Sequence, residues 1–382
     1  MYDHTCLGER IRHFRKERGL SQAALADKLF VSPQNVSKWE NGKSAPDIEN
    51  LCRLADVLGV GTDHLLYSEQ QPPRHLMLGI DGGGTKTEFC LFDREGHVQG
   101  RVRLGGSNPN VYGLENAIST LKEGIDALSG QKNGLYAIFA GVAGCGVESN
   151  KRAVLAALKK SYPGVHIEVQ NDAYNVIYST PYHEKCLMAI MGTGSVVFAK
   201  TEKGLIRLGG WGYLFDNGFS GYAIGRDAIM AALAAEDRFG EPTLLLEMLK
   251  DDLHNGVFES IPVLYQKPKE EIAAYPRLVF RAFLQGDAVA GEILRTRAAE
   301  LRRLIERAAA MYDVGTRVIL AGGLTRDREI VLGLLDTEHF SYVVPTLPPI
   351  YGACHYCARM MGEPPADFAA NFEQDYQEIA KE

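Results

Sequence analysis

A glycine-rich turn between two predicted strands constrains the fold of this chain more than any other feature. Residues 81–87 (DGGGTKT) follow the apolar segment 76–80 and precede a second strand at 88–93. A Rossmann turn and a Walker loop both lead into a helix, so this placement excludes them. A β-hairpin with three glycines can instead present backbone N–H groups to phosphate oxygens, because no Cβ blocks the approach. Asp81 can hold a magnesium ion, directly or through water, since hard cations prefer carboxylate oxygen.

A second glycine-rich turn supports the phosphate-binding interpretation. Residues 191–195 (MGTGS) again join two predicted strands, 186–191 and 195–200. A third glycine pair, Gly322-Gly323, follows the apolar strand 317–320. A plain tight turn would explain one such run as well as a ligand does, but the recurrence favours two phosphate-binding hairpins.

Strands and helices alternate through the rest of this region. Helical stretches near 112–129 and 148–160 alternate with strands near 135–140 and 166–170, and a long helical region follows at 220–312. Strand clusters interleaved with helices indicate α/β architecture, here in two lobes. We expect lobe I at 76–185, with a helix near 350–361 returning to it, lobe II at 186–349, and a C-terminal tail at 362–382.

The first part of the chain has a different pattern. Residues 5–66 show no strand-like alternation, and their apolar residues recur at helical spacing. We expect a compact bundle of five short helices at 1–67, followed by an exposed linker at 68–75 that contains two prolines. The signals for helix starts and ends are Gly19, Ser21, Ser32 with Pro33, Asn41-Gly42 and Asp47.

Basic residues concentrate in this first part, on a chain whose net charge is −7. Between Arg10 and Lys43 there are eight Lys and Arg residues against three acidic residues. Such an asymmetry hints at a basic module on an acidic body, although charge alone would favour a solvated helix face.

Residues 20–60 (LSQAALADKLFVSPQNVSKWENGKSAPDIENLCRLADVLGV) resemble the helix-turn-helix of phage-repressor-like, Xre-type transcription regulators. In that family the second helix of the motif, here about 33–40, lies in the major groove, where Gln and Asn can reach adenine and Lys can reach guanine. The alternative is a small helical bundle used for protein contacts. Val36 and Trp39 are expected in the core. The resemblance implies DNA contacts from Ser32, Gln34, Asn35, Ser37 and Lys38, and phosphate contacts from Gln22 and Asn41.

Residues 76 to about 360 resemble the BadF/BadG-type ATPases and N-acetylglucosamine kinases of the actin, sugar-kinase and heat-shock chaperone superfamily. The resemblance rests on the motifs DGGGTKTE, GSNPNVYG, NDAYN, MGTGSV, GGWGYLFDNG and AGGLT, in this order along the chain. Together the two parts imply an all-α helix-turn-helix bundle followed by an α/β two-lobed actin-like (ribonuclease H-like) ATPase/sugar kinase domain. ATP and Mg²⁺ are the implied cofactors.

The kinase resemblance assigns Asp172 as the catalytic base. The residue follows a predicted strand, where its carboxylate could accept the proton of a sugar hydroxyl that attacks the γ-phosphate. A helix N-cap is the alternative role, since Asp suits that position. The resemblance also implies that the two glycine hairpins bracket the phosphates of ATP and that the late glycine pair lies under the adenosine. These residues are Asp81, Gly82, Gly83, Gly84, Thr85, Lys86, Gly192, Thr193, Gly194, Gly322 and Gly323.

The sugar site is where this sequence departs from the kinase pattern. The best-known kinases have Gly-Asp-Glu-Gly-Ser after the tryptophan turn, whereas this chain has DNGFS at 216–220. The acid that would hold sugar hydroxyls is therefore displaced to Asp216 or replaced by Asn217. Trp211 could stack on the sugar or pack in the core. The implied sugar contacts are Asn108, Asp172, Ser195, Gly210, Trp211, Gly212, Asp216 and Asn217.

These features predict a DNA-binding transcriptional regulator whose kinase-like domain binds and phosphorylates an N-acetylated amino sugar, N-acetylglucosamine-like, or a related hexose. Two alternatives stay open: a non-catalytic sugar or nucleotide sensor that acts as a repressor, and a BadF-type ATPase activator. Asp172 favours the enzyme, whereas the segment 216–220 favours the sensor. Operator DNA, ATP and a small sugar are the expected partners, and a homodimer is expected because one helix-turn-helix covers only a half-site.

Composition bears on the expected location. The longest apolar runs are too short to span a bilayer, the N-terminus has no basic start followed by an apolar stretch, and the seven cysteines are scattered. We therefore expect a cytoplasmic protein without a membrane contact. Cys354 and Cys357 form a C-x-x-C pair, but a zinc site normally needs a second pair, so we assign them no metal.

Overall fold

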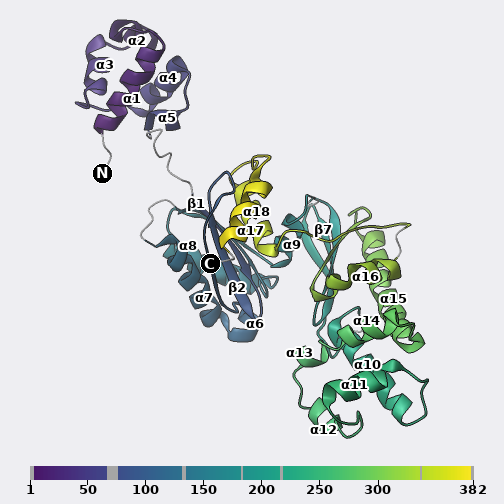
Figure 1. The fold of residues 1–382 in the computed structure, drawn as a ribbon. Helices are drawn as coiled ribbons and strands as arrows, with labels where there is room; N and C mark the ends of the chain where they lie inside the picture. Colours follow the sequence, from purple (N-terminus) through teal and green to yellow (C-terminus); the bar gives the residue numbers. More distant parts are fainter. Residues whose placement is uncertain are drawn as a thin grey trace. The chain divides into compact units, whose positions relative to one another are not determined.

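The computed structural model describes residues 4–66, 76–130, 135–181, 184–215, 218–335 and 338–379 (Figure 1). Contacts divide the chain into two compact units, Met1–Leu76 with Gln131–Tyr136 and Met77–Gly130 with Ala137–Glu382. The expected linker at 68–75 lies outside the described residues, as do Asp216 and Asn217. Among the described helices, none combines the length and the apolar character that a membrane crossing requires.

The first unit is a bundle of short helices whose starts are fixed by side-chain caps. Ser21 Oγ accepts a hydrogen bond from the backbone N–H of Ala24 at 3.0 Å, and Asp47 Oδ1 accepts one from Asn50 at 2.8 Å. Each cap satisfies a backbone donor that the first helical turn leaves without a partner. The helices are α1 (His4–Glu17), α2 (Gln22–Leu29), α3 (Pro33–Glu40), α4 (Ile48–Leu58) and α5 (Thr62–Leu66).

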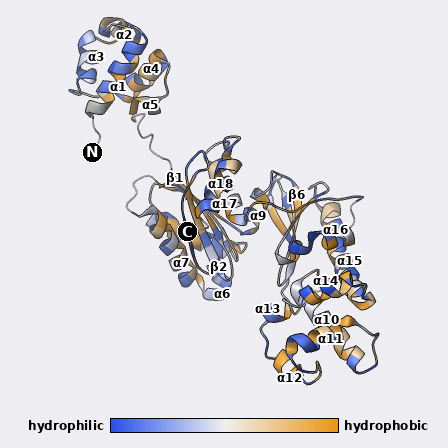
Figure 2. Ribbon diagram, viewed as in Figure 1, coloured by the Kyte–Doolittle hydropathy of each residue, from blue (hydrophilic) through white to orange (hydrophobic). Residues whose placement is uncertain are grey.

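These helices carry apolar and polar faces (Figure 2) and pack around one core. Val36 and Trp39 of α3 are buried, as the sequence predicts. α3 contacts both α1 and α2, and α4 contacts α2 and α5. The packing therefore fixes α3 by its buried side and leaves the opposite side exposed. The larger core residues are Leu7, Ile11, Phe14, Leu25, Leu29, Val36, Trp39, Leu54, Leu58 and Leu65.

The second unit contains two five-stranded sheets, and the first of them has the strand order β3-β2-β1-β4-β5. β1, β2 and β3 pair antiparallel, whereas β4 and β5 pair parallel. β1 and β2 are buried along nearly their whole length, as expected of strands with both faces covered. The elements are β1 (Leu76–Gly82), β2 (Lys86–Phe92), β3 (Val98–Gly105), α6 (Pro109–Tyr112), α7 (Leu114–Ser129), β4 (Leu135–Val142), α8 (Glu148–Ser161), β5 (His166–Gln170) and α9 (Ala173–Tyr178).

The second sheet has the order β10-β9-β6-β7-β8, and helices pack against it around a large hydrophobic core. Counted from its antiparallel edge, the order β8-β7-β6-β9-β10 repeats the arrangement of the first sheet. Two mixed sheets of this kind, each with its helices, make the two-lobed actin-like fold that the resemblance implies. The elements are β6 (Cys186–Met191), β7 (Ser195–Thr201), β8 (Gly204–Gly209), α10 (Gly221–Glu236), α11 (Leu244–Leu253), α12 (Ile261–Leu264), α13 (Lys269–Ile272), α14 (Pro276–Leu284), α15 (Ala288–Met311), β9 (Arg317–Ala321), the 3₁₀ helix η1 (Gly323–Asp327), α16 (Arg328–Leu334) and β10 (Ser341–Val343).

Two C-terminal helices lie on the first sheet rather than on the second. α17 (Pro349–Met360) contacts α9 and β2, and the backbones approach closely at small residues. A Cβ on Gly79 would lie 2.7 Å from the sulfur of Cys354, and one on Gly352 would lie 1.8 Å from the carbonyl oxygen of Asn175. α18 (Phe368–Ile379) contacts β3 and buries Phe368 and Phe372. The chain thus returns to its first sheet after it has built the second.

Candidate functional site

The turn between β1 and β2 is the first of the two predicted hairpins. The backbone N–H of Gly83 donates to the carbonyl of Lys86 at 2.9 Å and closes the turn. Gly82 has no room for a side chain, because a Cβ there would lie 2.6 Å from the hydroxyl oxygen of Ser107. A Cβ on Gly84 would meet no atom within 4 Å. Gly82 is therefore required by packing, whereas Gly84 leaves open space at the tip.

The turn between β6 and β7 is also closed by a backbone hydrogen bond, over a shorter span. The N–H of Gly192 donates to the carbonyl of Gly194 at 2.9 Å, and a Cβ on Gly194 would meet no atom within 4 Å. The start of α10 rests on this turn, since the N–H of Gly221 donates to Gly192 at 2.8 Å and that of Tyr222 to Thr193 at 3.1 Å. The positive end of the α10 dipole therefore lies beside the hairpin, which favours an anion there.

A cleft with a volume of about 1170 Å³ connects residues of both lobes. Its lining takes in Gly84 of the first hairpin and residues 192–195 of the second. It also takes in residues 144–148, which follow β4, and residues 170–172, which begin at the last residue of β5. Loops at the carboxyl ends of neighbouring strands thus face the glycine turns across one cavity, which is the usual place for a ligand in α/β proteins.

Asp172 lies on this cleft, between β5 and α9. Its side chain makes no capping hydrogen bond to α9, and Asn171 Oδ1 instead accepts from the N–H of Ala173 at 3.1 Å. Burial and the nearby charge of Asp81 raise the pKa of the Asp172 carboxyl to about 7, although neighbouring hydrogen-bond donors favour the ionised form. A carboxylate with that pKa can exchange a proton near neutral pH, which is what a general base must do.

Asp81, at the end of β1, is held by a residue far along the chain. Asn175 Nδ2 of α9 donates to Asp81 Oδ1 at 2.6 Å and to the carbonyl of Gly141 at 3.0 Å. Burial raises the pKa of Asp81 to about 6, and the charge of Glu88, its cross-strand neighbour, adds to the rise. A nearby cation would stabilise the ionised form of Asp81, because the opposite charge offsets the free-energy cost of burying the carboxylate.

ATP with Mg²⁺ fits these residues. Gly84, Gly194 and Gly323 each leave the space of a side chain open, so that backbone N–H groups can approach phosphate oxygens. The described residues contain no cluster of three or more His, Cys, Asp or Glu that could hold a metal ion. Asp81 would offer carboxylate oxygen, with water and phosphate completing the coordination, which is how Mg²⁺ commonly binds with nucleotides.

The structure brings some of the sequence-predicted residues to the cleft and leaves others beside it. Trp211 is 65% exposed and so does not pack in the core, and the guanidinium of Arg207 lies 4.7 Å from its ring centroid. A Cβ on Gly322 would lie 2.3 Å from the carbonyl oxygen of Met191, so this glycine packs against the second hairpin. The predicted residues that line the cleft are Gly84, Asn108, Asp172, Gly192, Thr193, Gly194, Ser195, Gly210 and Gly212. The predicted residues that do not line it are Asp81, Gly82, Gly83, Thr85, Lys86, Trp211, Gly322 and Gly323.

Sequence reasoning missed several residues of the cleft lining, and it missed the role of Asn175, which is buried and is not on the lining. Asn175 belongs to the NDAYN motif, so its position was visible in the sequence, but its bond to Asp81 was not. Lys203 and Arg207 gave no signal, because a turn lysine and a strand arginine usually lie on a solvated surface. Other lining residues that were not predicted include Asn110, Cys145, Glu148, Lys151, Gln170, Tyr174, Phe198, Leu205 and Tyr213.

The first unit presents the outer side of α3 to solvent. Gln34, Asn35 and Lys38 are exposed, and Ser37 is half-buried. Ser32 is exposed as well, but its hydroxyl accepts from the N–H of Asn35 at 3.3 Å and so caps the helix. The amide and ammonium groups of three predicted base contacts therefore point away from the core.

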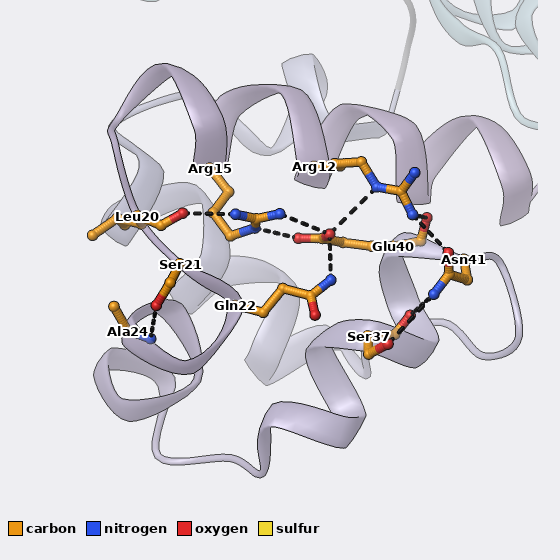
Figure 3. Close-up of polar contacts among 9 residues, drawn as sticks. All are labelled: Arg12, Arg15, Leu20, Ser21, Gln22, Ala24, Ser37, Glu40 and Asn41. Carbon is orange, nitrogen blue, oxygen red and sulfur yellow. Dashed lines mark hydrogen bonds and ion pairs between the residues drawn. The ribbon is translucent and has the colours of Figure 1, made fainter.

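The two residues predicted to contact DNA phosphates also form hydrogen bonds within the first unit (Figure 3). Gln22 Nε2 donates to Glu40 Oε2 at 2.8 Å, and Asn41 Oδ1 accepts from Arg12 at 2.6 Å. Glu40 is buried and also accepts from Arg15 at 2.5 and 3.0 Å. Burial by itself would raise the pKa of Glu40, but the bonds from Arg15, Gln22 and Arg12 outweigh it and lower this pKa. The network ties α1, α2 and α3 together.

Comparison with known proteins agrees with both parts. Residues 78–355 match the model of the BadF/BadG/BcrA/BcrD ATPase family, and residues 11–65 match a helix-turn-helix model. An N-acetylmuramic acid/N-acetylglucosamine kinase from Clostridium acetobutylicum is 31% identical over 265 residues, which are 65% of this chain and 85% of the relative. The prophage-derived HTH-type transcriptional regulator YonR of Bacillus subtilis is 44% identical over 59 residues, 15% of this chain and 55% of the relative.

A solved structure shows the same fold. A candidate N-acetylglucosamine kinase from Porphyromonas gingivalis superposes with a TM-score of 0.60 at 20% identity, over 74% of this chain and 99% of that chain. The chain therefore belongs to the BadF/BadG/BcrA/BcrD ATPase family, and it carries an Xre-type helix-turn-helix region ahead of a domain related to sugar kinases.

Proposed function

We propose that this protein is a DNA-binding regulator whose second unit transfers phosphate from ATP to an N-acetylated amino sugar or a related hexose. The observation that carries the kinase part is Asp172, a carboxylate that does not cap its helix and lies on a cleft shared with both glycine hairpins. Relatives named as kinases of N-acetylmuramic acid and N-acetyl-D-glucosamine support the substrate class.

In this proposal Asp172 is the general base. A sugar hydroxyl oxygen attacks the γ-phosphorus, the bond from that phosphorus to the bridging oxygen of ADP breaks, and the hydroxyl proton passes to Asp172. Because burial holds the pKa of Asp172 at about 7, the ionised carboxylate is both available and basic enough near neutral pH. Most of the rate enhancement must still come from positioning of the two substrates, since the protein takes little covalent part in phosphoryl transfer.

The hairpins and Asp81 would do the positioning. Residues 82–86 and 192–194 would place backbone donors around the phosphates. The adenosine would lie over Gly322 and Gly323, where Gly323 leaves the space of a side chain open. Mg²⁺, when bound, would neutralise phosphate charge. Asp81, fixed by Asn175, is the residue that would hold it. Asn108, Ser195, Gly210 and Gly212 would contact the sugar, and Asp216 or Asn217 would supply the remaining hydroxyl contact.

The first unit would bind operator DNA through α3. Gln34, Asn35 and Lys38 would reach base edges, while Gln22 and Asn41 would contact phosphates and hold the helix against the backbone. One such helix covers one half-site, so we infer a homodimer on a two-fold-related operator. Selection of bound sequences from a random pool, with the parent and Gln34→Ala, tests this. A discrimination loss of about 1–3 kcal/mol at particular base pairs is expected, and a pool without enrichment contradicts it.

The kinase proposal is tested with the full chain, ATP-Mg²⁺ and a panel of amino sugars and hexoses. Both phosphorylated product and thermal stabilisation are scored for each sugar. Turnover of an N-acetylated amino sugar that disappears in Asp172→Asn supports the kinase. Stabilisation by sugar without product contradicts turnover and favours the sensor, and ATP hydrolysis indifferent to every sugar favours the ATPase activator.

One observation favours the non-catalytic sensor as the second candidate. The segment 216–220 reads DNGFS where the best-known sugar kinases carry an adjacent Asp-Glu pair. Loss of an acid that holds sugar hydroxyls would weaken orientation of the acceptor more than binding of ATP. The same panel separates the two candidates, because a sensor would be stabilised by its sugar and would form no phosphorylated product in the parent or in Asp172→Asn.

A further inference from the structure

Arg207 of β8 projects from the side of the second sheet that faces the cleft. It lies opposite Phe198 in the β7–β8 register, and both residues line the cleft. Residues directly opposite on an antiparallel pair share one face of the sheet, and every second residue of a strand returns to that face. Val196 and Leu205 follow this alternation and line the cleft as well. The Arg207 side chain therefore starts from the wall of the cleft and not from the outer surface of the sheet.

The guanidinium of Arg207 turns toward the second glycine hairpin. Its Nη1 donates to the carbonyl of Gly210 at 3.4 Å, and its carbon lies 4.7 Å from the centroid of the Trp211 ring. Gly210 is next to the start of β7, because a Cβ there would lie 3.6 Å from the carbonyl oxygen of Ser195. Ser195 directly follows the glycines of the hairpin. The charge of Arg207 is therefore held at the end of the cleft where the proposed function places the phosphates of ATP.

The other cations of the cleft are placed differently. The described lining residues with a lysine or arginine side chain are Lys151, Lys203 and Arg207. Lys151 already donates to Gln170 at 2.8 Å. Lys203 follows β7 at the opposite end of the ladder, roughly 20 Å from the hairpin at roughly 3.3 Å per residue. Lys86 of the first hairpin is exposed and does not line the cleft. Arg207 is thus the lining cation of the second lobe that lies beside the hairpin.

The Arg207 guanidinium keeps hydrogen-bond donors available for a ligand. Within the described residues it has no ion-pair partner, and its bond to Gly210 is long at 3.4 Å. A guanidinium offers five N–H donors in a planar fork, and two of them can bind two oxygens of one phosphate. The acidic residues of the lining do not take up these donors, because Glu148 pairs with Arg152 at 2.9 Å and Asp172 is the proposed base.

A cation at this place suits the chemistry of phosphoryl transfer. As the bond to ADP breaks, negative charge spreads over the three equatorial oxygens of the moving group, and catalysis consists mostly of positioning and charge stabilisation. The residues assigned so far to the phosphates act through neutral backbone N–H groups, and only Mg²⁺ would bring positive charge. A fixed guanidinium that interacts more strongly with the transition state than with bound ATP raises kcat more than it lowers KM.

We propose that Arg207 is a catalytic residue that binds the transferred phosphoryl group, with Trp211 as its positioning residue. The inference rests on the proposed kinase function. The guanidinium would exchange its long bond to Gly210 for two hydrogen bonds to γ-phosphate oxygens. It would hold them while the phosphorus leaves the bridging oxygen of ADP and bonds to the sugar oxygen. The guanidinium keeps all its protons in this step, because the hydroxyl proton passes to Asp172.

Steady-state kinetics of the full chain test this role, with ATP-Mg²⁺ and either N-acetylglucosamine or N-acetylmuramic acid. Arg207→Gln should lower kcat by about 10²–10³-fold, as for other fixed donors that act in the transition state. Both KM values should stay near those of the parent, since the lost interaction belongs to the transition state. Arg207→Lys keeps the charge without the fork, so its kcat should be intermediate. Trp211→Phe, which keeps a ring beside the guanidinium, should retain most of the kcat that Trp211→Ala loses.

Two further measurements separate this role from a structural one. Added guanidinium ion should restore part of the kcat of Arg207→Ala, whereas added urea, which is neutral, should not. Calorimetry then compares ADP-Mg²⁺ with aluminium fluoride, which mimics the moving phosphoryl group, and a non-hydrolysable ATP analogue. In Arg207→Gln the affinity for the aluminium fluoride complex should fall by about tenfold or more, as for a hydrogen bond to a charged group. The affinity for the ATP analogue should stay near that of the parent.

The matched control is Arg303→Gln, which removes the same charge from an exposed position of α15, outside the cleft lining. It should keep the kcat of the parent. If the parent forms product and Arg207→Gln matches its kcat, only this inference is overturned. A rise in the KM for the sugar without a fall in kcat also overturns it, because Arg207 would then serve sugar binding. A parent that phosphorylates neither sugar contradicts the proposed kinase function, and this inference fails together with it.

Discussion

The carboxylate of Asp172 lies on the cleft and makes no capping bond to α9. Its replacement should therefore lower the rate of phosphoryl transfer more than it lowers the stability of the fold. Asp172→Asn keeps the shape of the side chain and removes the proton acceptor. We expect kcat to fall by about 10²–10⁴-fold, the usual contribution of a general base. Calorimetric affinities for ATP and sugar should stay close to those of the parent. Phosphorylation at the parent rate would show that Asp172 serves only the local structure.

Glu40 gives the first unit a pH-dependent stability. Its pKa is lowered from the ordinary 4.5, because the bonds from Arg15, Gln22 and Arg12 outweigh the effect of burial. A carboxyl whose pKa is depressed by folding stabilises the fold above its unfolded pKa, and that contribution disappears as pH falls through the folded pKa. We therefore expect the unfolding free energy of the first unit to fall below about pH 4.5.

Glu40→Gln should remove much of that stability at pH 7. Removing one partner of a buried ion pair lowers the free energy of unfolding by about 3–5 kcal/mol. Because the glutamine amide keeps one oxygen that can accept hydrogen bonds, we expect a decrease near the lower end of that range. Hydrogen exchange of the α1 and α3 amides in the full chain measures it. Glu17→Gln, at the exposed end of α1, is the control and should change little. Equal protection in both variants would contradict a stabilising role for the Glu40 network.

At the scale of elements, each of the two hairpins leaves open space at one glycine of its turn. A Cβ on Gly194 would meet no atom within 4 Å, so a side chain there disturbs nothing in the protein itself. Gly194→Val would fill the space that a phosphate should occupy. We expect the affinity for Mg-ATP to fall by about tenfold or more, since backbone approach to phosphate requires that space.

Calorimetry with Mg-ATP measures this loss. Gly333→Val provides the matched control, because that glycine, in α16, also has no atom within 4 Å of a Cβ and lies outside the cleft lining. It should leave the affinity unchanged. Unchanged affinity in Gly194→Val, with the thermal transition preserved, would remove the second hairpin from the nucleotide site.

For the whole molecule, one chain carries a DNA-binding region and a ligand-binding cleft. A ligand can change operator affinity only if it binds two arrangements of the protein with different free energies. We expect a coupling of about 1–3 kcal/mol, with operator DNA changing sugar affinity by the same factor. The measurement compares operator affinity with and without saturating sugar and a non-hydrolysable ATP analogue. Equal affinities across a broad sugar panel would mean that the two parts act independently.

Much of the fold was predictable because its signals are local. The caps at Ser21 and Asp47 depend on residues within three positions, and both are found. The glycine turns were predictable for the same reason, since each hairpin is closed by its own strands. The order of the motifs then indicated the two-lobed fold and the family. These signals did not locate Lys203 at the cleft, because the turn that carries it meets α9, where a Cβ on Gly204 would lie 3.9 Å from the hydroxyl oxygen of Tyr174.

The sequence by itself determined the two-part organisation, the helix-turn-helix and the position of Asp172 after a strand, because each depends on a short run of residues. Only the tertiary structure decided which polar groups meet. Asn175 reaches Asp81 across 94 positions, and Gln22 donates to Glu40 from a different helix. Such pairs form because sheets and helices bring distant segments to one place, and burial then makes each unpaired polar group costly. No short sequence pattern indicates which of these distant polar groups will pair.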